Sequence, residues 1–223
     1  MSSMIGGRSG NRGECAQNCR MQYQLEKSEN GKKEVLSGKG AYLLSPQDMN
    51  TLDHVPELIE AGIASFKIEG RMKRPEYVAV MVALYRQAID AYYEGTSFIV
   101  DEEKLTEMKK VFNRGFTQGH LFHAYGPSLM NPLRPNHMGI AIGKVIRIRK
   151  QRMVIELCAD LMQGDGIRIL KDKEDEGFRV NRIYQNDLLV HEAKAGDIIE
   201  LDKSGYVEVG ARLVKTSDTK QLK

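Results

Sequence analysis

Residues 41–95 read AYLLSPQDMNTLDHVPELIEAGIASFKIEGRMKRPEYVAVMVALYRQAIDAYYEG. Two short apolar runs, each about as long as a buried strand, alternate there with two longer runs of helical period. We expect the strands at residues 41–46 and 64–70, and the helices at residues 52–61 and 75–94. Strands that alternate with helices are typical of parallel sheets, so this stretch predicts a βαβα unit.

The second helix of this unit has one strongly apolar face. Pro75 stands in its first turn and Gly95 just past its end, as capping preferences require. Two parallel strands and two helices cannot cover both faces and both edges of a sheet. We therefore expect an incomplete barrel, whose other strands lie upstream of residue 1 or come from a second copy of the chain. The apolar positions follow the 3.6-residue period and are Val78, Met81, Val82, Tyr85, Ala88, Ile89 and Tyr92.

Turn and capping residues organise the rest of the chain. Residues 24–39 predict a hairpin around Asn30-Gly31, a dipeptide that tolerates positive φ at both positions. Asp101 is expected to cap a spacer helix at residues 101–114. From Met138 onward, seven short alternating runs separated by turns predict a small closed antiparallel β-barrel.

The predicted fold class is therefore α/β plus all-β, in three ranges. Residues 1–39 contain a cysteine loop and the hairpin, residues 40–127 the βαβα unit and the spacer helix, and residues 128–223 the small barrel. Gly-Asp occurs at Gly164-Asp165 and again at Gly196-Asp197, a weak internal echo within the barrel range and not a true repeat.

Composition narrows the class of protein only slightly. The net charge of +3 is too small to indicate nucleic acid by itself. No run of eighteen apolar residues occurs and the first thirty residues are polar, so we expect a cytoplasmic protein without membrane contact. Three cysteines cannot all pair within the chain, which favours metal or redox chemistry over a structural disulfide.

The first candidate site is the loop RSGNRGECAQNCR at residues 8–20, which has two cysteines among three arginines. The positive field favours thiolates, so Cys15 and Cys19 are candidate metal ligands. The alternative is two free cysteines in a loop. Two thiolates are too few for a closed site, and the other ligands must come from elsewhere. Three histidines, better explained as surface or packing residues, are candidates by type only: His120, His123 and His137. Cys158 is expected to be a small core residue of a strand.

The second candidate site is the segment from Ser65 to Arg71. On a strand, Phe66 and Ile68 would point toward the helices, whereas Lys67 and Glu69 would face the barrel interior. Active sites of (β/α) barrels form at the carboxyl ends of the strands, so Lys67, Glu69 and Arg71 are candidate catalytic residues. The alternative is an ion pair that only sets barrel packing.

The first strand also ends in polar residues, the run from Ser45 to Asp48, which would lie at the same barrel mouth; Asp48 could equally cap the following turn. Cations near both strands could form one basic rim that binds phosphates, although a solvated charge run is the usual explanation. These cations are Arg8, Arg12, Arg20, Arg71, Lys73 and Arg74. No H-E-x-x-H or G-x-S-x-G motif is present, so the familiar hydrolase signatures are absent from the sequence.

Three stretches resemble the U-thirty-two peptidase family, whose members are named collagenase-like peptidases. They are NRGECAQNCRMQY at residues 11–23, YLLSPQDMNTLDHVPELIEAGIASFKIEGRMKRPEYVA at residues 42–79, and RPNHMGIAIGKV at residues 134–145. The resemblance implies the last two β/α units of a (β/α)8 TIM-type barrel, an iron–sulfur cluster, and a small barrel similar to those of translation factors. It also implies that Cys15 and Cys19 are two cluster ligands and that Lys67, Glu69 and Arg71 belong to the last barrel strand.

Several bacterial members of that family are RNA hydroxylation proteins, which act on a transfer-RNA wobble uridine or a ribosomal-RNA cytidine, with prephenate implicated. By motif, this sequence resembles the longer, ribosomal-RNA type. It begins after the first six barrel strands and the upstream cysteine pair, so we expect a truncated chain that builds only half a cluster. The expected parent is an enzyme with RNA as its partner. The alternatives are a peptidase with a protein substrate and a C-terminal barrel that docks RNA or protein, and the open barrel could self-associate.

Overall fold

The computed structural model describes residues 2–36, 40–70, 73–123, 125–171, 175–203 and 205–220. The chain folds as two compact units, each built from two segments. Unit 1 combines Met1–Thr51 with Asn113–His137, and unit 2 combines Leu52–Phe112 with Met138–Lys223. Both units therefore draw on more than one of the ranges predicted from the sequence.

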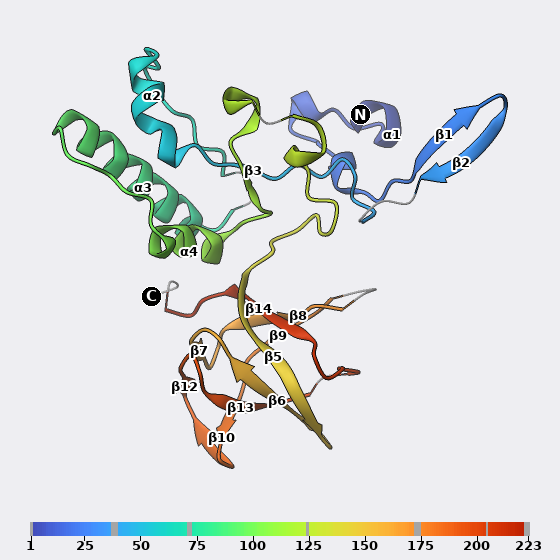
Figure 1. Ribbon diagram of the computed structural model, residues 1–223, viewed down its shortest axis with the longest axis vertical. Coiled ribbons are helices and arrows are strands. Elements are labelled where there is room, and N and C mark those ends of the chain that lie inside the picture. Colours follow the sequence, from blue (N-terminus) through green and yellow to red (C-terminus); the bar gives the residue numbers. More distant parts are fainter. Residues whose placement is uncertain are drawn as a thin grey trace. The chain divides into compact units, whose positions relative to one another are not determined.

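Unit 1 begins with short helical turns, which are α1 (Ser2–Gly6), η1 (Gly10–Arg12) and η2 (Asn18–Arg20). A two-stranded antiparallel hairpin follows, formed by β1 (Leu25–Glu29) and β2 (Lys32–Leu36) (Figure 1). Asn30 and Gly31 connect the strands with φ values of 51° and 76°. Both values are positive, as a tight hairpin turn demands, so the predicted hairpin is confirmed up to Leu36. Its last three residues, 37–39, lie outside the described residues.

The predicted strand at residues 41–46 is wrong. The structure instead pairs β3 (Asp48–Met49) with β4 (Phe116–Thr117), which are parallel. Residues 42–45 form a turn in which the Ser45 amide donates to the Tyr42 carbonyl at 3.0 Å. Pro46 has no amide hydrogen, and its carbonyl accepts a hydrogen bond from a side chain. The segment pairs with residues 130–132 only through an isolated antiparallel bridge between Pro46 and Met130 and a few single hydrogen bonds, so no ladder forms. The rest of unit 1 contains η4 (Gly119–Phe122) and η5 (Gly126–Leu129).

The predicted helices are present in unit 2. Residues 52–61 form η3 (Leu52–His54) and α2 (Val55–Glu60), and the apolar run that follows Pro75 forms α3 (Pro75–Tyr93). The spacer helix is α4 (Glu102–Val111), capped as predicted by Asp101, whose side chain accepts from the Lys104 amide at 2.9 Å. Only part of the apolar face of α3 is buried, at Met81, Leu84 and Ala88, whereas Val78 and Val82 are exposed.

Residues 64–70 are not a strand, because no other described segment forms a ladder with them. The alternation predicted for a strand is still present. Phe66 and Ile68 are half-buried, and the Phe66 ring lies 6.3 Å from that of Tyr85 on α3, centroid to centroid. Lys67 and Glu69 are exposed. The apolar pair therefore meets a helix as predicted, whereas the charged pair faces solvent.

The C-terminal part of unit 2 is a curled antiparallel sheet of eight strands, in the order β11-β10-β13-β6-β5-β14-β8-β9. Its edges, β11 and β9, do not pair with each other, so the expected closed barrel is corrected to a curled sheet. A separate two-stranded pair, β7 with β12, lies in the same region. The strands are β5 (Ile140–Arg149), β6 (Arg152–Leu157), β7 (Leu161–Met162), β8 (Gly166–Ile169), β9 (Glu176–Arg179), β10 (Ile183–Gln185), β11 (Leu188–Val190), β12 (Glu192–Ala193), β13 (Ile198–Asp202) and β14 (Arg212–Ser217).

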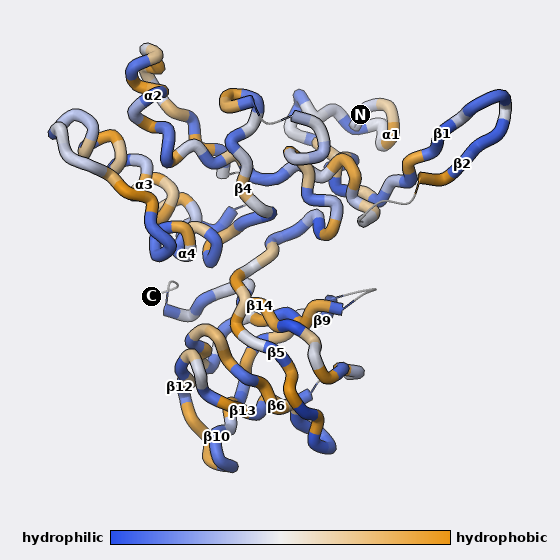
Figure 2. The backbone as a smooth tube through the Cα atoms, viewed as in Figure 1, coloured by the Kyte–Doolittle hydropathy of each residue, from blue (hydrophilic) through white to orange (hydrophobic). Residues whose placement is uncertain are grey.

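The curl of this sheet encloses one apolar core, and its strands are visibly richer in apolar residues than the β1–β2 hairpin (Figure 2). Ile142, Met153, Ile155 and Leu213 are among its fully buried side chains. Burial of each such side chain stabilises the fold by roughly 1.5–3 kcal/mol. Cys158 is not part of this core, which corrects its predicted position: it follows β6 on the side of Glu156 and is exposed.

The two Gly-Asp turns are structurally equivalent. Each aspartate accepts a hydrogen bond from the amide three residues earlier: Asp165 from Met162 at 2.9 Å, and Asp197 from Lys194 at 2.7 Å. The preceding glycines have φ values of 96° and 92°, a region that favours glycine. Each turn also exchanges two backbone hydrogen bonds with the end of a neighbouring strand, at Val180 and Leu157 respectively. The echo in the sequence is therefore a repeated turn.

One of these turns contains a buried ion network. Lys215 on β14 is only 5% exposed, and its Nζ lies 2.8 Å from Asp165 and 3.3 Å from Asp218. Burial opposes ionisation of Asp165, but hydrogen bonds from Lys215 and from the amides of Thr219 and Met162 hold its pKa below the ordinary value. Asp165 therefore adds stability above the pKa of an unfolded aspartate, about 3.9, and this contribution is lost as the pH falls through the lower folded value.

Lys215→Ala should lower the free energy of unfolding of unit 2 by about 3–5 kcal/mol, because it leaves the buried Asp165 carboxylate without its cation. Lys144→Ala is the matched control, since Lys144 forms an exposed ion pair with Glu156 on the same sheet and should change stability by about 0–1 kcal/mol. Urea unfolding followed by circular dichroism measures both. Equal losses in the two variants would contradict a structural role for the buried network.

Candidate functional site

The polar residues predicted for the end of the first strand form a half-buried cluster in unit 1. We call it the polar junction, made of Arg20, Ser45, Pro46, Asp48 and Arg114. Arg20 follows Cys19 in η2, and its Nη1 donates to the Ser45 Oγ and to the Pro46 carbonyl, both at 2.6 Å. Ser45 is fully buried. The junction therefore ties the cysteine loop to the segment that precedes β3.

Asp48 completes the junction by binding Arg114, which lies 66 residues further along the chain. The Arg114 Nε donates to the Asp48 Oδ1 at 3.0 Å, and the Arg114 amide donates to the Oδ2 at 2.8 Å. The side-chain amide of Asn131 donates to the Arg114 carbonyl at 2.8 Å. Asp48 is therefore a long-range ion-pair partner and does more than cap the next turn.

The junction has more positive than negative charge. Burial lowers the pKa of Arg20 below its ordinary value, and repulsion from Arg114 lowers it further, whereas Cys19 and Asp48 act in the opposite direction. Two half-buried guanidinium groups thus lie near one carboxylate, which forms its ion pair with Arg114. Such an arrangement suits a phosphate or carboxylate ligand, which planar guanidinium groups bind well.

The two cysteines lie next to this junction in sequence and are free thiols. Cys15 is exposed, and its Sγ accepts from the Gln17 amide at 3.4 Å and lies 3.5 Å from the Ser2 Oγ. Cys19 is half-buried. Thiols suit iron or zinc, but within the described ranges no three His, Cys, Asp or Glu side chains are grouped to hold a metal. The donor chemistry therefore fits an iron–sulfur cluster, whereas the number of ligands does not.

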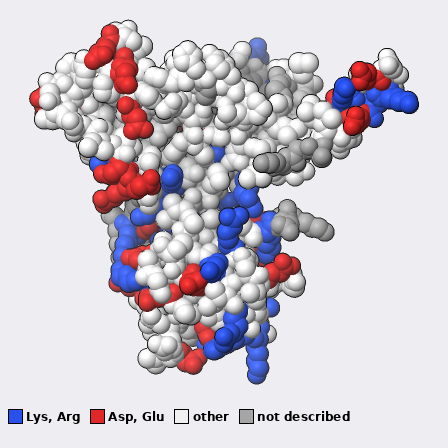
Figure 3. Space-filling model, viewed as in Figure 1, with Lys and Arg blue, Asp and Glu red and all other residues white. Residues whose placement is uncertain are grey.

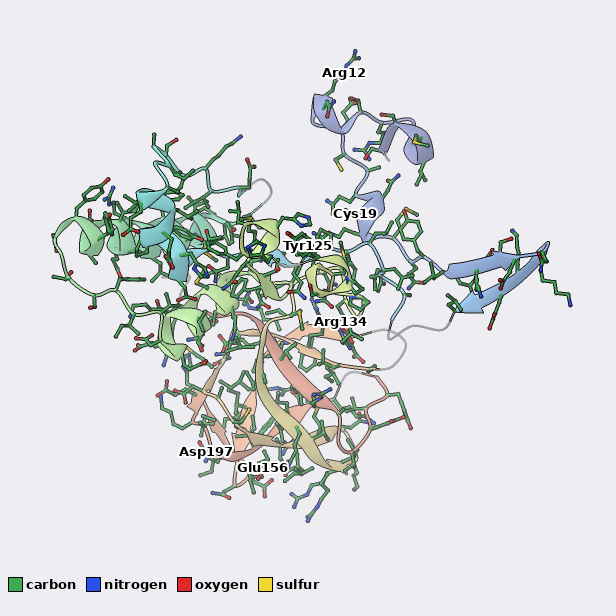
Figure 4. The ribbon with its side chains drawn as sticks, turned by 45° about the horizontal axis from the view of Figure 1, so that its top comes forward. Arg12, Cys19, Tyr125, Arg134, Glu156 and Asp197 are labelled. Carbon is green, nitrogen blue, oxygen red and sulfur yellow. The ribbon has the colours of Figure 1, made fainter. Side chains whose placement is uncertain are left out.

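The structure separates the arginines of the cysteine loop. Arg8 and Arg12 are exposed, and Figure 4 shows Arg12 at the far end of the N-terminal segment, directed away from Cys19. Only Arg20 takes part in the junction. His120 and His123 are exposed and lie beside the ring of Tyr125.

His137 accepts a hydrogen bond at its Nδ1 from the Asn113 amide at 3.0 Å. That contact agrees with the packing role considered from the sequence.

The other candidate residues belong to unit 2. Lys67 and Glu69 form an ion pair of 3.1 Å, and their side chains are 88% and 72% exposed, so the pair does not sit in an interior. Lys73 places its Nζ over the Phe112 ring, and Arg74 is exposed immediately before α3. Arg71 lies outside the described residues.

Sequence reasoning missed Arg114, although its side chain holds Asp48. The missed signal is the segment Asn113-Arg114-Gly115, in which a cation follows the spacer helix and precedes a glycine with φ of 86°. Sequence spacing does not reveal that Asp48 is the partner of Arg114, because the two residues are brought together by the pairing of β3 with β4 across the whole helical region. Among the helices that the structure describes, none has the length and apolarity needed to cross a membrane.

The model of peptidase family U32 matches residues 1–131. The chain is 33% identical to an uncharacterized protease of Methanocaldococcus jannaschii over 98% of the chain and 56% of that protein. It is 34% identical to the 23S rRNA 5-hydroxycytidine synthase of Escherichia coli over 79% of the chain and 27% of that protein. It is 40% identical to a collagenase of Porphyromonas gingivalis over 50% of the chain and 27% of that protein.

The chain belongs to peptidase family U32, because the family model covers more than half of its residues. Its relatives bear names from two different chemistries, proteolysis and RNA hydroxylation. The chain spans about half the length of one of these three proteins and about a quarter of the other two.

Arg20→Ala should loosen unit 1 locally, because it removes both hydrogen bonds that hold Ser45 and Pro46. A buried hydroxyl left without its donor costs about 1–3 kcal/mol, so amides of residues 42–50 should exchange with solvent about ten-fold faster or more. Hydrogen exchange read by mass spectrometry tests this, with the exposed Arg12→Ala as the matched control. Unchanged exchange in Arg20→Ala would show that the junction does not organise this segment.

Proposed function

We propose that residues 1–223 form part of a longer iron–sulfur enzyme that hydroxylates a base in RNA, most closely of the ribosomal-RNA type. The observation that carries this proposal is the pair of free thiols, Cys15 and Cys19, on a loop anchored by Arg20. The pair supplies soft metal ligands, and the sequence has no familiar hydrolase motif beside it. The relative from Escherichia coli, whose name states RNA hydroxylation, adds support.

In the longer enzyme, two further cysteines upstream would complete the cluster ligands. Residues 64–70 would become the last strand of a (β/α)8 barrel. The support for this is the alternating burial from Phe66 to Glu69, together with backbone groups that no described strand pairs. Closure of the barrel would then place Lys67, Glu69 and Arg71 at the carboxyl end of that strand, where barrel active sites form.

In this proposal Glu69 acts as an acceptor or base toward the RNA base, and Lys67 is its ion-pair partner. Arg8, Arg12, Arg20, Lys73 and Arg74 would provide cations for the phosphate backbone. Prephenate, which the family resemblance implicates in the hydroxylation, is proposed as a requirement of the reaction. Activity is proposed for the longer enzyme and not for residues 1–223 alone.

The second candidate is proteolysis of collagen-like or other unstructured protein. It is favoured by the printed names of the relatives from Methanocaldococcus jannaschii and Porphyromonas gingivalis. A peptidase has no evident need for a cluster, so iron and sulfide analysis of the longer protein separates the two candidates. A third candidate is a docking role for the C-terminal sheet, with RNA or protein as partner.

The longer protein should restore 5-hydroxycytidine to 23S rRNA in an Escherichia coli strain that lacks its own synthase, as measured by mass spectrometry of RNA digests. Glu69→Gln should lower the yield about 100-fold or more, because the amide cannot act as a base. It should leave the melting temperature unchanged, since Glu69 is exposed. Glu60→Gln, on the exposed side of α2, is the matched control.

Three results would contradict the assignment. Formation of hydroxylated transfer-RNA uridine without 5-hydroxycytidine would show that the substrate is transfer RNA and not ribosomal RNA. Peptide release from denatured collagen without any modified base would favour the peptidase. A large fall in melting temperature with normal yield in Glu69→Gln would make the Lys67–Glu69 pair a packing feature.

Cys15→Ser and Cys19→Ser should each abolish the visible absorbance of the longer protein, because each removes one thiolate ligand from iron. Cys158→Ser is the matched control and should keep that absorbance, since Cys158 lies in the sheet region of unit 2. Absorbance, iron and sulfide retained in both loop variants would refute the ligand assignment.

A further inference from the structure

The outer side of four neighbouring strands in the C-terminal sheet, β5, β6, β13 and β10, is rich in cations. Directly opposite residues in an antiparallel sheet point to the same side. The register places Arg149 opposite Arg152, and Arg152 opposite Asp202. We call this surface the basic face. Its cations are Arg147, Arg149, Lys150, Arg152, Arg182 and Lys203, and its acidic residues are Asp187, Glu200 and Asp202.

The cations of the basic face outnumber its acidic residues by three, which equals the net charge of the whole chain. Figure 3 shows Lys and Arg side chains gathered around the end of the β5–β6 hairpin. Arg147 and Lys150 are both exposed, and neither forms an ion pair with another described residue. Their charge is available to a ligand.

The remaining arginines are held in a defined arrangement. The Arg152 guanidinium carbon lies 3.6 Å from the centroid of the Tyr184 ring, which orients the guanidinium. Glu200 accepts from Arg149 at 2.6 Å and from Arg152 at 3.3 Å, so one carboxylate fixes two arginines. Arg182 donates to Asp202 at 3.0 Å. The acidic residues therefore position the cations and leave an excess of positive charge at the surface.

We propose that the basic face binds the phosphate backbone of single-stranded RNA. A row of cations across adjacent strands matches the regular spacing of a polyanion, and guanidinium groups bind phosphate oxygens with several donors. An arginine stacked on an aromatic ring also presents a flat surface on which an RNA base can stack. The proposal extends the proposed function by assigning an RNA contact to the C-terminal sheet, and it concerns binding and not the hydroxylation step.

The test is fluorescence anisotropy of a 5′-labelled oligouridine of about 20 nucleotides with the chain of residues 1–223, titrated at several salt concentrations. The double variant Arg147→Gln/Lys150→Gln removes the two cations without an ion-pair partner, so it should fold normally. It should weaken binding about ten-fold near 0.1 M salt and reduce the salt slope of log K by about 1.4. Lys27→Gln/Lys33→Gln, in the exposed β1–β2 hairpin, is the matched control and should bind as the unchanged chain does.

Equal binding by the two double variants and the unchanged chain would overturn the proposal, as would tighter binding of a polyglutamate peptide than of the RNA at the same salt. Normal 5-hydroxycytidine formation by a longer protein that carries Arg147→Gln/Lys150→Gln, together with unchanged RNA binding, would refute the basic face and leave the proposed function standing. Weakened RNA binding by the double variant, together with no hydroxylated base formed by the unchanged longer protein, would support the basic face and refute the proposed function.

Discussion

A β-strand persists only where a neighbour takes up its backbone hydrogen bonds, and this constraint decides most of the structure. The C-terminal region satisfies it, because each of its ladders runs between strands that follow one another closely or meet across the curl. Residues 64–70 have no ladder among the described residues. The side chains from Phe66 to Glu69 nevertheless alternate in burial, so the local pattern is present without a paired strand in the described part of the chain.

The same constraint explains how far the sequence could predict the fold. Local features were predicted well: the Asn30-Gly31 turn, the Asp101 cap and the limits of α3 depend on residues that are close in sequence. Sheet closure and the strand at 41–46 depended on distant partners, and both predictions were wrong. Pro46 was a visible warning in the second case, since it cannot donate to a ladder.

The candidate site shows the same division. Cys15, Cys19 and Arg20 were identifiable because they cluster within one loop of the sequence. Arg114 was not, because its contact with Asp48 links segments on either side of the helices. The resulting junction fastens the cysteine loop to the segment before β3. A ligand bound near the cysteines would therefore meet an already ordered backbone and would bear less of the entropic cost of ordering it.

The two equivalent Gly-Asp turns each lead into a strand of the C-terminal sheet, β8 after Asp165 and β13 after Asp197. The two aspartates differ in role: Asp197 serves its own turn, whereas Asp165 also neutralises Lys215 in the interior. Asp197 should therefore tolerate replacement by asparagine, which keeps the hydrogen-bond acceptor, better than Asp165, which must keep its charge.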